Sequence, residues 1–305
     1  MGRAGTTAPL PLNTPLNNCR NRPVQITLRH ILFSTAILAG LAAPASAKNW
    51  LSNIFGGKDE PAGTAGEETS EPVNEMYNKA LAQLKDGQYK TAAKQFGEVE
   101  RQHPYSGLAT KAILMQAFAH YQRNSYDDAV NSAQRFIALH PGHKDTSYAY
   151  YLVALSNYER ILDVKRDQSQ TQKALDSLDE VSRRYPGTKY AQDAEQKAVL
   201  ARDHLAGKEL DVGRYYLKKG SYLGAINRYK KVVTDYQTTS HVPEALYRLT
   251  EAYLALGVRS EAQTAAAVLG HNYPGSEWYK DAFSLLQNDG LLPSESKSSW
   301  LSSLF

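Results

Sequence analysis

Histidine is the residue type that most often binds metals or transfers protons near neutral pH, so the histidines are the first candidates for chemistry. Only His140 and His143 lie close together, and they flank a Pro-Gly pair. We interpret them as loop residues, with a metal site as the alternative. Outside the N-terminal stretch the histidines stand at positions 103, 120, 140, 143, 204, 241 and 271.

The patterns of common catalytic and nucleotide-binding sites are missing from the sequence. It has no G-x-S-x-G, H-E-x-x-H, P-loop or G-x-G-x-x-G pattern. Serine and aspartate are frequent, but at positions that suit helix caps and solvated surfaces. We therefore expect a binding protein and not an enzyme, with no metal and no cofactor.

The elements that position the remaining side chains are helices, and they repeat. From Asn74 to about Gln287 the sequence is rich in Ala, Leu and Tyr at helical spacing. An Ala occurs at the corresponding position of five units. In four of them, the residue twelve positions after this Ala is Pro. Proline would end the second helix of each unit. The pairs are Ala92 with Pro104, Ala129 with Pro141, Ala174 with Pro186, Ala262 with Pro274, and Ala225 with Gln237.

Short turns and small residues complete these units. Gly87, Asn124, Gly220 and Gly257 stand where the chain would reverse between two helices, and Gly and Asn accept the left-handed conformation needed there. Twelve residues before the Ala, most units have another small residue, which lets two antiparallel helices approach closely. These residues are Ala80, Ala117 and Gly213, with Thr250 in the last unit.

The small–Ala–Pro spacing closely resembles the tetratricopeptide repeat, with an irregular helical bundle as the alternative. The resemblance implies an all-α solenoid of about five repeats, with ten or eleven helices. Two units are longer than usual. A polar surplus surrounds residues 164–170, and the surplus after Pro186 predicts an extra helix from Tyr190 to about Leu205.

The tetratricopeptide resemblance implies that four positions of each first helix line a concave groove. In the first three units six of these twelve residues are aromatic and only Lys111 is charged. Such a groove suits an extended peptide with aromatic or aliphatic side chains, and Lys111 could meet its terminal carboxylate. Alternatively, several of the tyrosines pack between repeats. The twelve are Asn74, Tyr77, Leu81, Leu84, Lys111, Leu114, Phe118, Tyr121, Tyr148, Tyr151, Leu155 and Tyr158.

The N-terminal stretch has the features of a secretory signal. Residues 1–58 contain no acidic residue, and arginines precede a short apolar run at residues 31–41. Ala45-Ser46-Ala47 then forms an A-x-A site, which predicts cleavage after Ala47. An uncleaved anchor is the alternative. We expect a signal peptide at 1–47, a disordered linker at 48–73, the repeat domain at 74–287 and a flexible tail at 288–305.

Removal of the signal would change the charge and the cysteine content. The signal holds four arginines, which leaves 35 − 4 = 31 basic residues against 31 acidic ones. The basic character therefore gives no argument for nucleic-acid binding. Cys19, the one cysteine, would be lost as well, so the remaining chain could form no disulfide.

Longer stretches resemble one family of tetratricopeptide proteins. Residues 208–236, the segment "HVPEALYRLTEAYLALG" and the segment "NYPGSEWYKDA" are similar to the C-terminal half of BamD, a subunit of the outer-membrane β-barrel assembly machine. Residues 135–155 resemble its middle. The resemblance implies a periplasmic scaffold, peripheral to the outer membrane at its inner face, that works with other assembly-complex subunits.

The resemblance also implies two partners. The C-terminal half would hold the last POTRA domain of the barrel protein BamA, and the N-terminal half would receive the C-terminal signal of unfolded outer-membrane proteins. Asn227 and Arg228 match an Asn-Arg pair of the family, so we expect a BamA contact there. A solvated surface charge is the alternative for Arg228. A periplasmic repeat protein that coordinates envelope constriction or binds peptidoglycan is the alternative function.

One departure from the family concerns the lipid anchor. BamD proteins usually carry a lipid on a cysteine after Leu-Ala-Gly, whereas here Leu38-Ala39-Gly40 precedes Leu41. We expect the related hexapeptides at 50–55 ("WLSNIF") and 300–305 ("WLSSLF") to act as weak membrane contacts through Trp50, Phe55, Trp300 and Phe305. Mimicry of a substrate signal by the second hexapeptide, or capping of the terminal repeats by both, are the alternatives.

Overall fold

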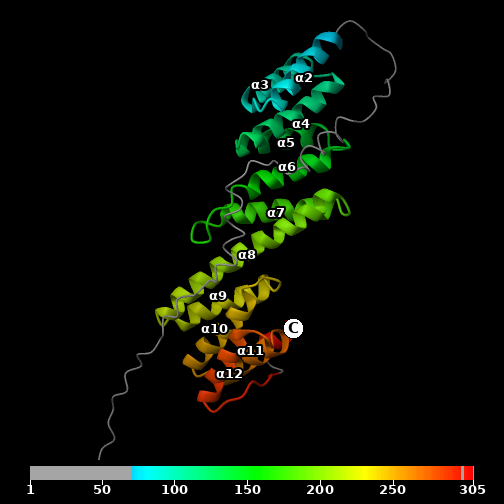
Figure 1. Ribbon diagram of the computed structural model, residues 1–305. Coiled ribbons are helices and arrows are strands. Elements are labelled where there is room, and N and C mark those ends of the chain that lie inside the picture. The colour runs from blue at the N-terminus through cyan, green and yellow to red at the C-terminus, as the bar shows by residue number, and fades with distance from the viewer. Residues whose placement is uncertain (1–69, 297–298, 305) are drawn as a thin grey trace, which may run out of the picture. The chain divides into compact units, whose positions relative to one another are not determined.

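The computed structural model describes residues 70–296 and 299–304, and within them the fold is all-α (Figure 1). The predicted signal peptide, its cleavage at Ala47, most of the linker, the first hexapeptide and Phe305 lie outside the described residues. The α-helices are α2 (Ser70–Lys85), α3 (Tyr89–Gln102), α4 (Gly107–Gln122), α5 (Tyr126–Leu139), α6 (Thr146–Tyr158), α7 (Ser169–Arg184), α8 (Lys189–Lys218), α9 (Tyr222–Asp235), α10 (Val242–Ala255), α11 (Arg259–Asn272) and α12 (Glu277–Asn288), and a 3₁₀ helix, η2 (Trp300–Ser303), follows.

The turns between paired helices confirm the sequence interpretation. Gly87, Asn124, Gly220 and Gly257 have φ values between 62° and 76°, in the left-handed region. Asn124 is the one non-glycine residue with positive φ in the described part of the chain. These residues let the first helix of a unit stop and the second return antiparallel to it.

The second helices end just before the predicted proline positions. His103, His140, Tyr185 and Tyr273 each precede a proline and have φ between −134° and −129°. Proline cannot continue a helix, but Tyr236, which precedes Gln237, has the same φ of −129°, so this end geometry does not require the proline. Each of their N–H groups still donates to the carbonyl four residues earlier, which closes the last helical turn.

Each helix packs on the next helix along the chain, and the first helices of successive units also contact one another. These contacts join α2 to α4, α4 to α6, α6 to α8, and α10 to α12 (Figure 1). A layer of first helices covered by a layer of second helices is the arrangement of a tetratricopeptide solenoid. The predicted fold class is therefore confirmed.

Helix α8 differs from the prediction in length. The sequence predicted an extra helix that ends near Leu205, whereas α8 runs without a break from Lys189 to Lys218. It joins the extra helix to the first helix of the next unit. Gly207 and Gly213 lie within α8 without the positive φ of a helix end, and each accommodates a close neighbour: a Cβ would lie 3.1 Å from His241 Nε2 and 2.4 Å from Tyr229 Cε1, respectively.

The two halves of α8 belong to different hydrophobic cores. Ala198 is buried with Leu178 of α7 in one cluster. Leu210 is buried with Tyr229 of α9 in another, which extends through α10, α11 and α12. Helix α8 is thus a structural link between the N-terminal and C-terminal parts of the solenoid.

The C-terminal residues correct the prediction of a flexible tail from residue 288. Leu301 is fully buried in the C-terminal core, and Trp300 and Leu304 pack against the same cluster. Helix η2 contacts α11. At the other end α2 begins at Ser70, four residues before the predicted start at Asn74. Among the described residues, we find no helix with the length and apolar character required to cross a bilayer.

Candidate functional site

Four half-buried tyrosines form a surface that we call the tyrosine face: Tyr121 of α4, Tyr151 and Tyr158 of α6, and Tyr190 of α8. The rings of Tyr151 and Tyr190 lie 5.2 Å apart, centroid to centroid. Rings at this distance interact favourably and present flat apolar surface with polar tips. Three of the four were predicted from repeat position, and α8 adds the fourth.

Carboxylates fix the hydroxyl groups of this face. Tyr151 donates a hydrogen bond of 2.5 Å to Asp193 Oδ2, and Tyr121 donates one of 3.3 Å to Glu159 Oε1. Burial raises the pKa of Tyr121 and of Tyr151 above the usual value, and the two carboxylates raise it further. These hydroxyls therefore stay protonated at any physiological pH and act as fixed donors.

Helix α8 supplies residues that the sequence interpretation missed. Lys197 pairs with Asp193 at 2.8 Å, and its ammonium group lies 5.8 Å from the centre of the Tyr158 ring. Tyr190, Asp193 and Lys197 follow at spacings of three and four residues, which places them on one side of a helix. That spacing could have indicated that one side of the extra helix adds residues to the same surface.

Four of the twelve predicted groove residues are buried in the structure, which corrects their assignment to an open groove. Tyr77, Leu114 and Tyr148 are only 4–6% exposed. Tyr77 packs edge-on against Phe96 of α3 at 5.5 Å, and Tyr148 lies beneath Tyr190 at 5.6 Å. These side chains pack beneath the surface. This agrees with the alternative that several of the tyrosines pack between repeats. Of the remaining positions, Leu84 is also buried and Leu81, Phe118 and Leu155 are partly buried.

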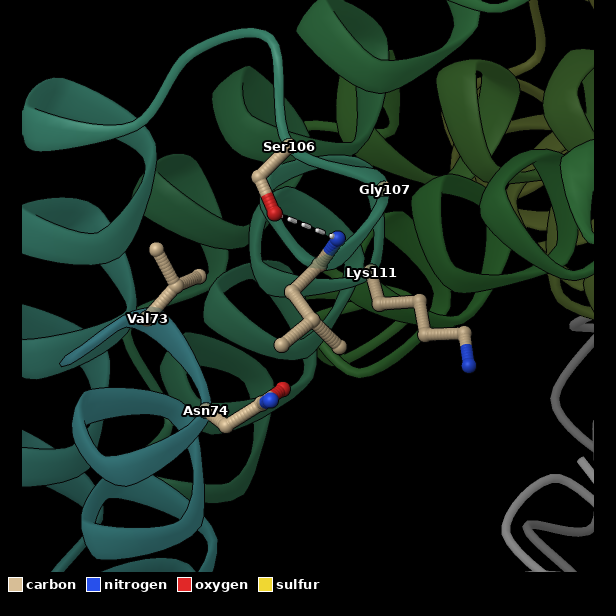
Figure 2. A pocket seen from close by; sticks show the side chains of 6 residues that line it. Val73, Asn74, Ser106, Gly107 and Lys111 are labelled. Carbon is tan, nitrogen blue, oxygen red and sulfur yellow. Dashed lines mark hydrogen bonds between the residues drawn. The ribbon is translucent and has the colours of Figure 1, made fainter. Parts of the chain in front are cut away.

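A pocket of about 310 Å³ opens between α2 and α4 (Figure 2). Asn74 and Val73 of α2 stand on one side of it, and Lys111 of α4 stands on the other. Ser106 caps α4 by accepting a hydrogen bond from the Leu108 N–H at 3.2 Å. Asn74 and Lys111 are both exposed, so the predicted pair lies at an accessible opening that contains one cationic group.

The predicted BamA-contact residues lie on α9. Arg228 is held by Glu209 of α8, with Nη1 2.9 Å from Oε2, while Lys231 binds the other carboxylate oxygen at 2.8 Å. Burial alone would raise the pKa of Glu209, but the two cations together lower it. Arg228 is thus positioned by an ion pair and keeps 42% of its side chain exposed. Asn227 beside it is exposed.

A large apolar side chain is also exposed on α9. Leu223, four residues before Asn227 and so on the same side of the helix, is 68% exposed. An exposed large apolar residue beside a fixed charge is typical of a protein-binding surface. We call Leu223, Asn227 and Arg228 the α9 face.

The histidine pair packs against α5, and the second hexapeptide packs against α9, α10 and α11. His140 and His143 both pack against Phe136, each at 5.5 Å. No group of three or more potential metal ligands is found in the part of the chain that the structure describes. Trp300, predicted to contact a membrane, donates instead to the Tyr253 hydroxyl at 3.1 Å, so this placement favours capping for the second hexapeptide.

Comparison with known proteins agrees with this architecture. A family model described as "Outer membrane lipoprotein" matches residues 69–269. A Caulobacter vibrioides protein named outer membrane protein assembly factor BamD is 50% identical over 222 residues, 73% of each chain. The chain belongs to the BamD family. A protein of the same name from Rickettsia prowazekii is 46% identical over 71% of this chain and 86% of its own length. Another, from Xylella fastidiosa, is 34% identical over 68% of this chain and 75% of its own length.

Membership of the BamD family confirms the resemblance inferred from residues 135–155 and 208–236. It also decides against the alternative of an envelope-constriction or peptidoglycan-binding protein. The matched region contains all helices from α2 to α10 and most of α11, so both the tyrosine face and the α9 face lie within the family's shared part.

Proposed function

We propose that this member of the BamD family is a periplasmic scaffold of outer-membrane protein assembly, peripherally associated with the inner face of the outer membrane. Its α9 face binds the POTRA domain of BamA, alongside other subunits of the assembly complex. Its tyrosine face and the pocket beside Lys111 receive the C-terminal signal of unfolded outer-membrane proteins and hold it for insertion. The observation that carries the proposal is the tyrosine face, whose rings are already ordered.

Ordered aromatic rings suit a peptide ligand for a physical reason. Binding an extended chain costs conformational entropy, and a surface whose side chains are fixed beforehand lowers that cost. Tyr121 and Tyr151 are fixed by carboxylates, and Lys197 lies over Tyr158. The ring faces would contact aromatic or aliphatic side chains of the signal.

A peptide-binding experiment tests the tyrosine face. A labelled peptide that ends in an aromatic residue, as barrel signals do, is titrated against the full chain by fluorescence anisotropy. Tyr158→Ala should weaken binding about tenfold, because it removes an aromatic contact surface of roughly 1–2 kcal/mol. Tyr215, which is 60% exposed near the C-terminal end of α8 and outside the tyrosine face, provides the matched control: Tyr215→Ala should leave affinity unchanged. Equal effects of both variants would contradict the assignment.

The role of Lys111 is tested with the same titration. If Lys111 binds the terminal carboxylate of the signal, Lys111→Ala and amidation of the peptide terminus each weaken binding, and the two changes together weaken it no further. Additive losses would show that Lys111 does not meet the carboxylate.

The α9 face offers a matched pair of variants. Arg228 and Lys231 bind the same carboxylate, so removing either one leaves Glu209 with one partner. Arg228→Ala should weaken POTRA-domain binding at least tenfold in calorimetry, whereas Lys231→Ala should change it little. Equal losses would mean that the ion pair matters only for local structure and that Arg228 does not contact the partner.

A further inference from the structure

The second hexapeptide occupies a specific site formed by α9, α10 and α11. The indole Nε1 of Trp300 donates to the Tyr253 hydroxyl at 3.1 Å, and the Lys230 ammonium group lies 4.3 Å from the centre of the indole ring. Leu301 is fully buried. Each of these contacts requires a particular side chain in the hexapeptide, so a generic apolar segment would not reproduce them.

The residue before the hexapeptide makes two further bonds. Ser299 Oγ accepts a hydrogen bond from the Leu301 N–H at 3.3 Å and so caps η2. The same hydroxyl donates to Glu261 Oε2 of α11 at 2.7 Å, although Ser299 is only 4% exposed. A residue at this position must therefore both cap a helical turn and donate to a carboxylate. We call Lys230, Tyr253 and Glu261 the hexapeptide seat.

The first hexapeptide has matching residues at the positions that contact the seat. Trp50 and Leu51 are identical to the Trp and Leu that fill the seat, and Ile54 corresponds to Leu304, which packs on the same cluster. Asn49 stands where Ser299 caps η2. Asparagine is among the best helix caps, and its amide group can accept and donate at once.

We propose that the hexapeptide seat is a recognition site for this motif and that Asn49–Phe55 is its second ligand. The two copies are alternative occupants: when residues 299–304 leave the seat, Asn49–Phe55 binds there with the same contacts. The exchange ties the N-terminal linker to the C-terminal half of the solenoid. This proposal is independent of the function proposed for the tyrosine face and the α9 face.

The test is direct binding of an acetylated, fluorescent peptide of residues 48–55. The host is the full chain with Trp50→Ala, Trp300→Ala and Leu301→Ala, which disables both of its own copies. We expect saturable binding, and none for the peptide with Trp50→Ala. Adding Tyr253→Phe to the host should weaken binding about fivefold, because the indole N–H loses its acceptor. Adding Lys230→Ala should weaken it about threefold by loss of the cation–π contact.

Two results would overturn the proposal. One is the absence of saturable binding by a host whose circular dichroism matches that of the unmodified chain. The other is binding that neither Tyr253→Phe nor Lys230→Ala changes. If the triple variant fails to fold, the peptide with a photo-crosslinker at Asn53 is added in excess to the unmodified chain instead. Crosslinks to α9, α10 or α11 support the proposal, and crosslinks only elsewhere, or none, overturn it.

Discussion

At the scale of single residues, Gly213 shows how a small side chain determines the distance between helices. Tyr229 of α9 is fully buried, and its ring lies against the backbone of α8 at Gly213. A Cβ at this glycine would stand 2.4 Å from Tyr229 Cε1, which is shorter than any van der Waals contact. The ring is buried and belongs to the C-terminal core, so it has little freedom to move away.

Gly213→Ala should therefore destabilise the protein by about 1–3 kcal/mol, the usual cost of overpacking a well-packed core. The gain in helix propensity from Gly to Ala, about 1 kcal/mol, offsets part of this cost. Urea unfolding followed by circular dichroism measures the difference. Gly142→Ala is the control, because nothing lies within 4 Å of a Cβ there. A Gly213→Ala variant more stable than the unmodified chain by about 1 kcal/mol, the gain expected from helix propensity alone, would contradict the close approach.

Asp203 of α8 carries a pH-dependent contribution to stability. Its hydrogen bonds from His241 and then Ser240 lower its pKa from 3.8 to about 2. The pKa of Asp203 is lower in the folded protein than in the unfolded chain. The Asp203 carboxylate therefore stabilises the fold at pH values above the unfolded pKa, and this contribution is lost as the pH falls from about 4 towards 2. Asp203→Asn should lower the free energy of unfolding at pH 7 by about 1 kcal/mol after allowance for solvent screening.

The same variant should lose stability less steeply than the unmodified chain between pH 4 and 2. Unfolding in urea at several pH values measures both effects. The exposed Asp281→Asn on α12 serves as the matched control and should leave the pH profile unchanged. Parallel profiles for Asp203→Asn and the unmodified chain would show that this bond contributes nothing.

At the scale of elements, α8 connects the two cores, and the role of its continuity can be tested apart from that of its side chains. Leu200 is 54% exposed on α8, so its replacement tests the backbone and not the core. Leu200→Pro should cost about 3 kcal/mol or more, because proline removes a helical hydrogen bond and clashes with the preceding turn. Leu200→Ala should cost little. Melting by circular dichroism measures both.

A second control places proline at the start of the same helix. Lys189 is the first residue of α8, and Thr188 before it is already extended at φ −79° and ψ 154°. This geometry suits a following proline, so Lys189→Pro should be tolerated. If Lys189→Pro and Leu200→Pro were equally harmful, position along the helix would not explain the effect.

The repeat units could be predicted from the sequence because their signals are local. A left-handed turn at Gly87 or Asn124 restricts the residue type, and a proline after His103 or His140 stops a helix, whatever the distant surroundings are. The continuity of α8 was not predictable in this way. Gly207 looks like a helix end in the sequence, and its tolerance within α8 depends on its packing against His241, which comes from a later unit.

The candidate site was predictable only in part, for a related reason. Repeat position placed Tyr121, Tyr151 and Tyr158 on one surface, and the structure agrees. The burial of Tyr148 was missed because it depends on Tyr190, which the longer unit brings over it. Burial of a ring is set by contacts between units, and a repeat pattern describes only positions within one unit.

At the scale of the whole molecule, the chain presents two different surfaces on one continuous scaffold. The tyrosine face lies on α4, α6 and the N-terminal part of α8, and the α9 face lies on α9. No residue belongs to both surfaces. A scaffold with separate surfaces can hold a substrate segment and a partner at the same time, which is the central claim of the proposed function.

Formation of a ternary complex is the measurement that tests this claim most directly. The labelled signal peptide is bound to the full chain, and an excess of the BamA POTRA domain is added while anisotropy and complex mass are followed. We predict that the peptide stays bound, with its Kd changed by less than about threefold, and that one complex contains all three components. Displacement of the peptide by the POTRA domain would contradict the account, because it would mean that both ligands bind the same surface.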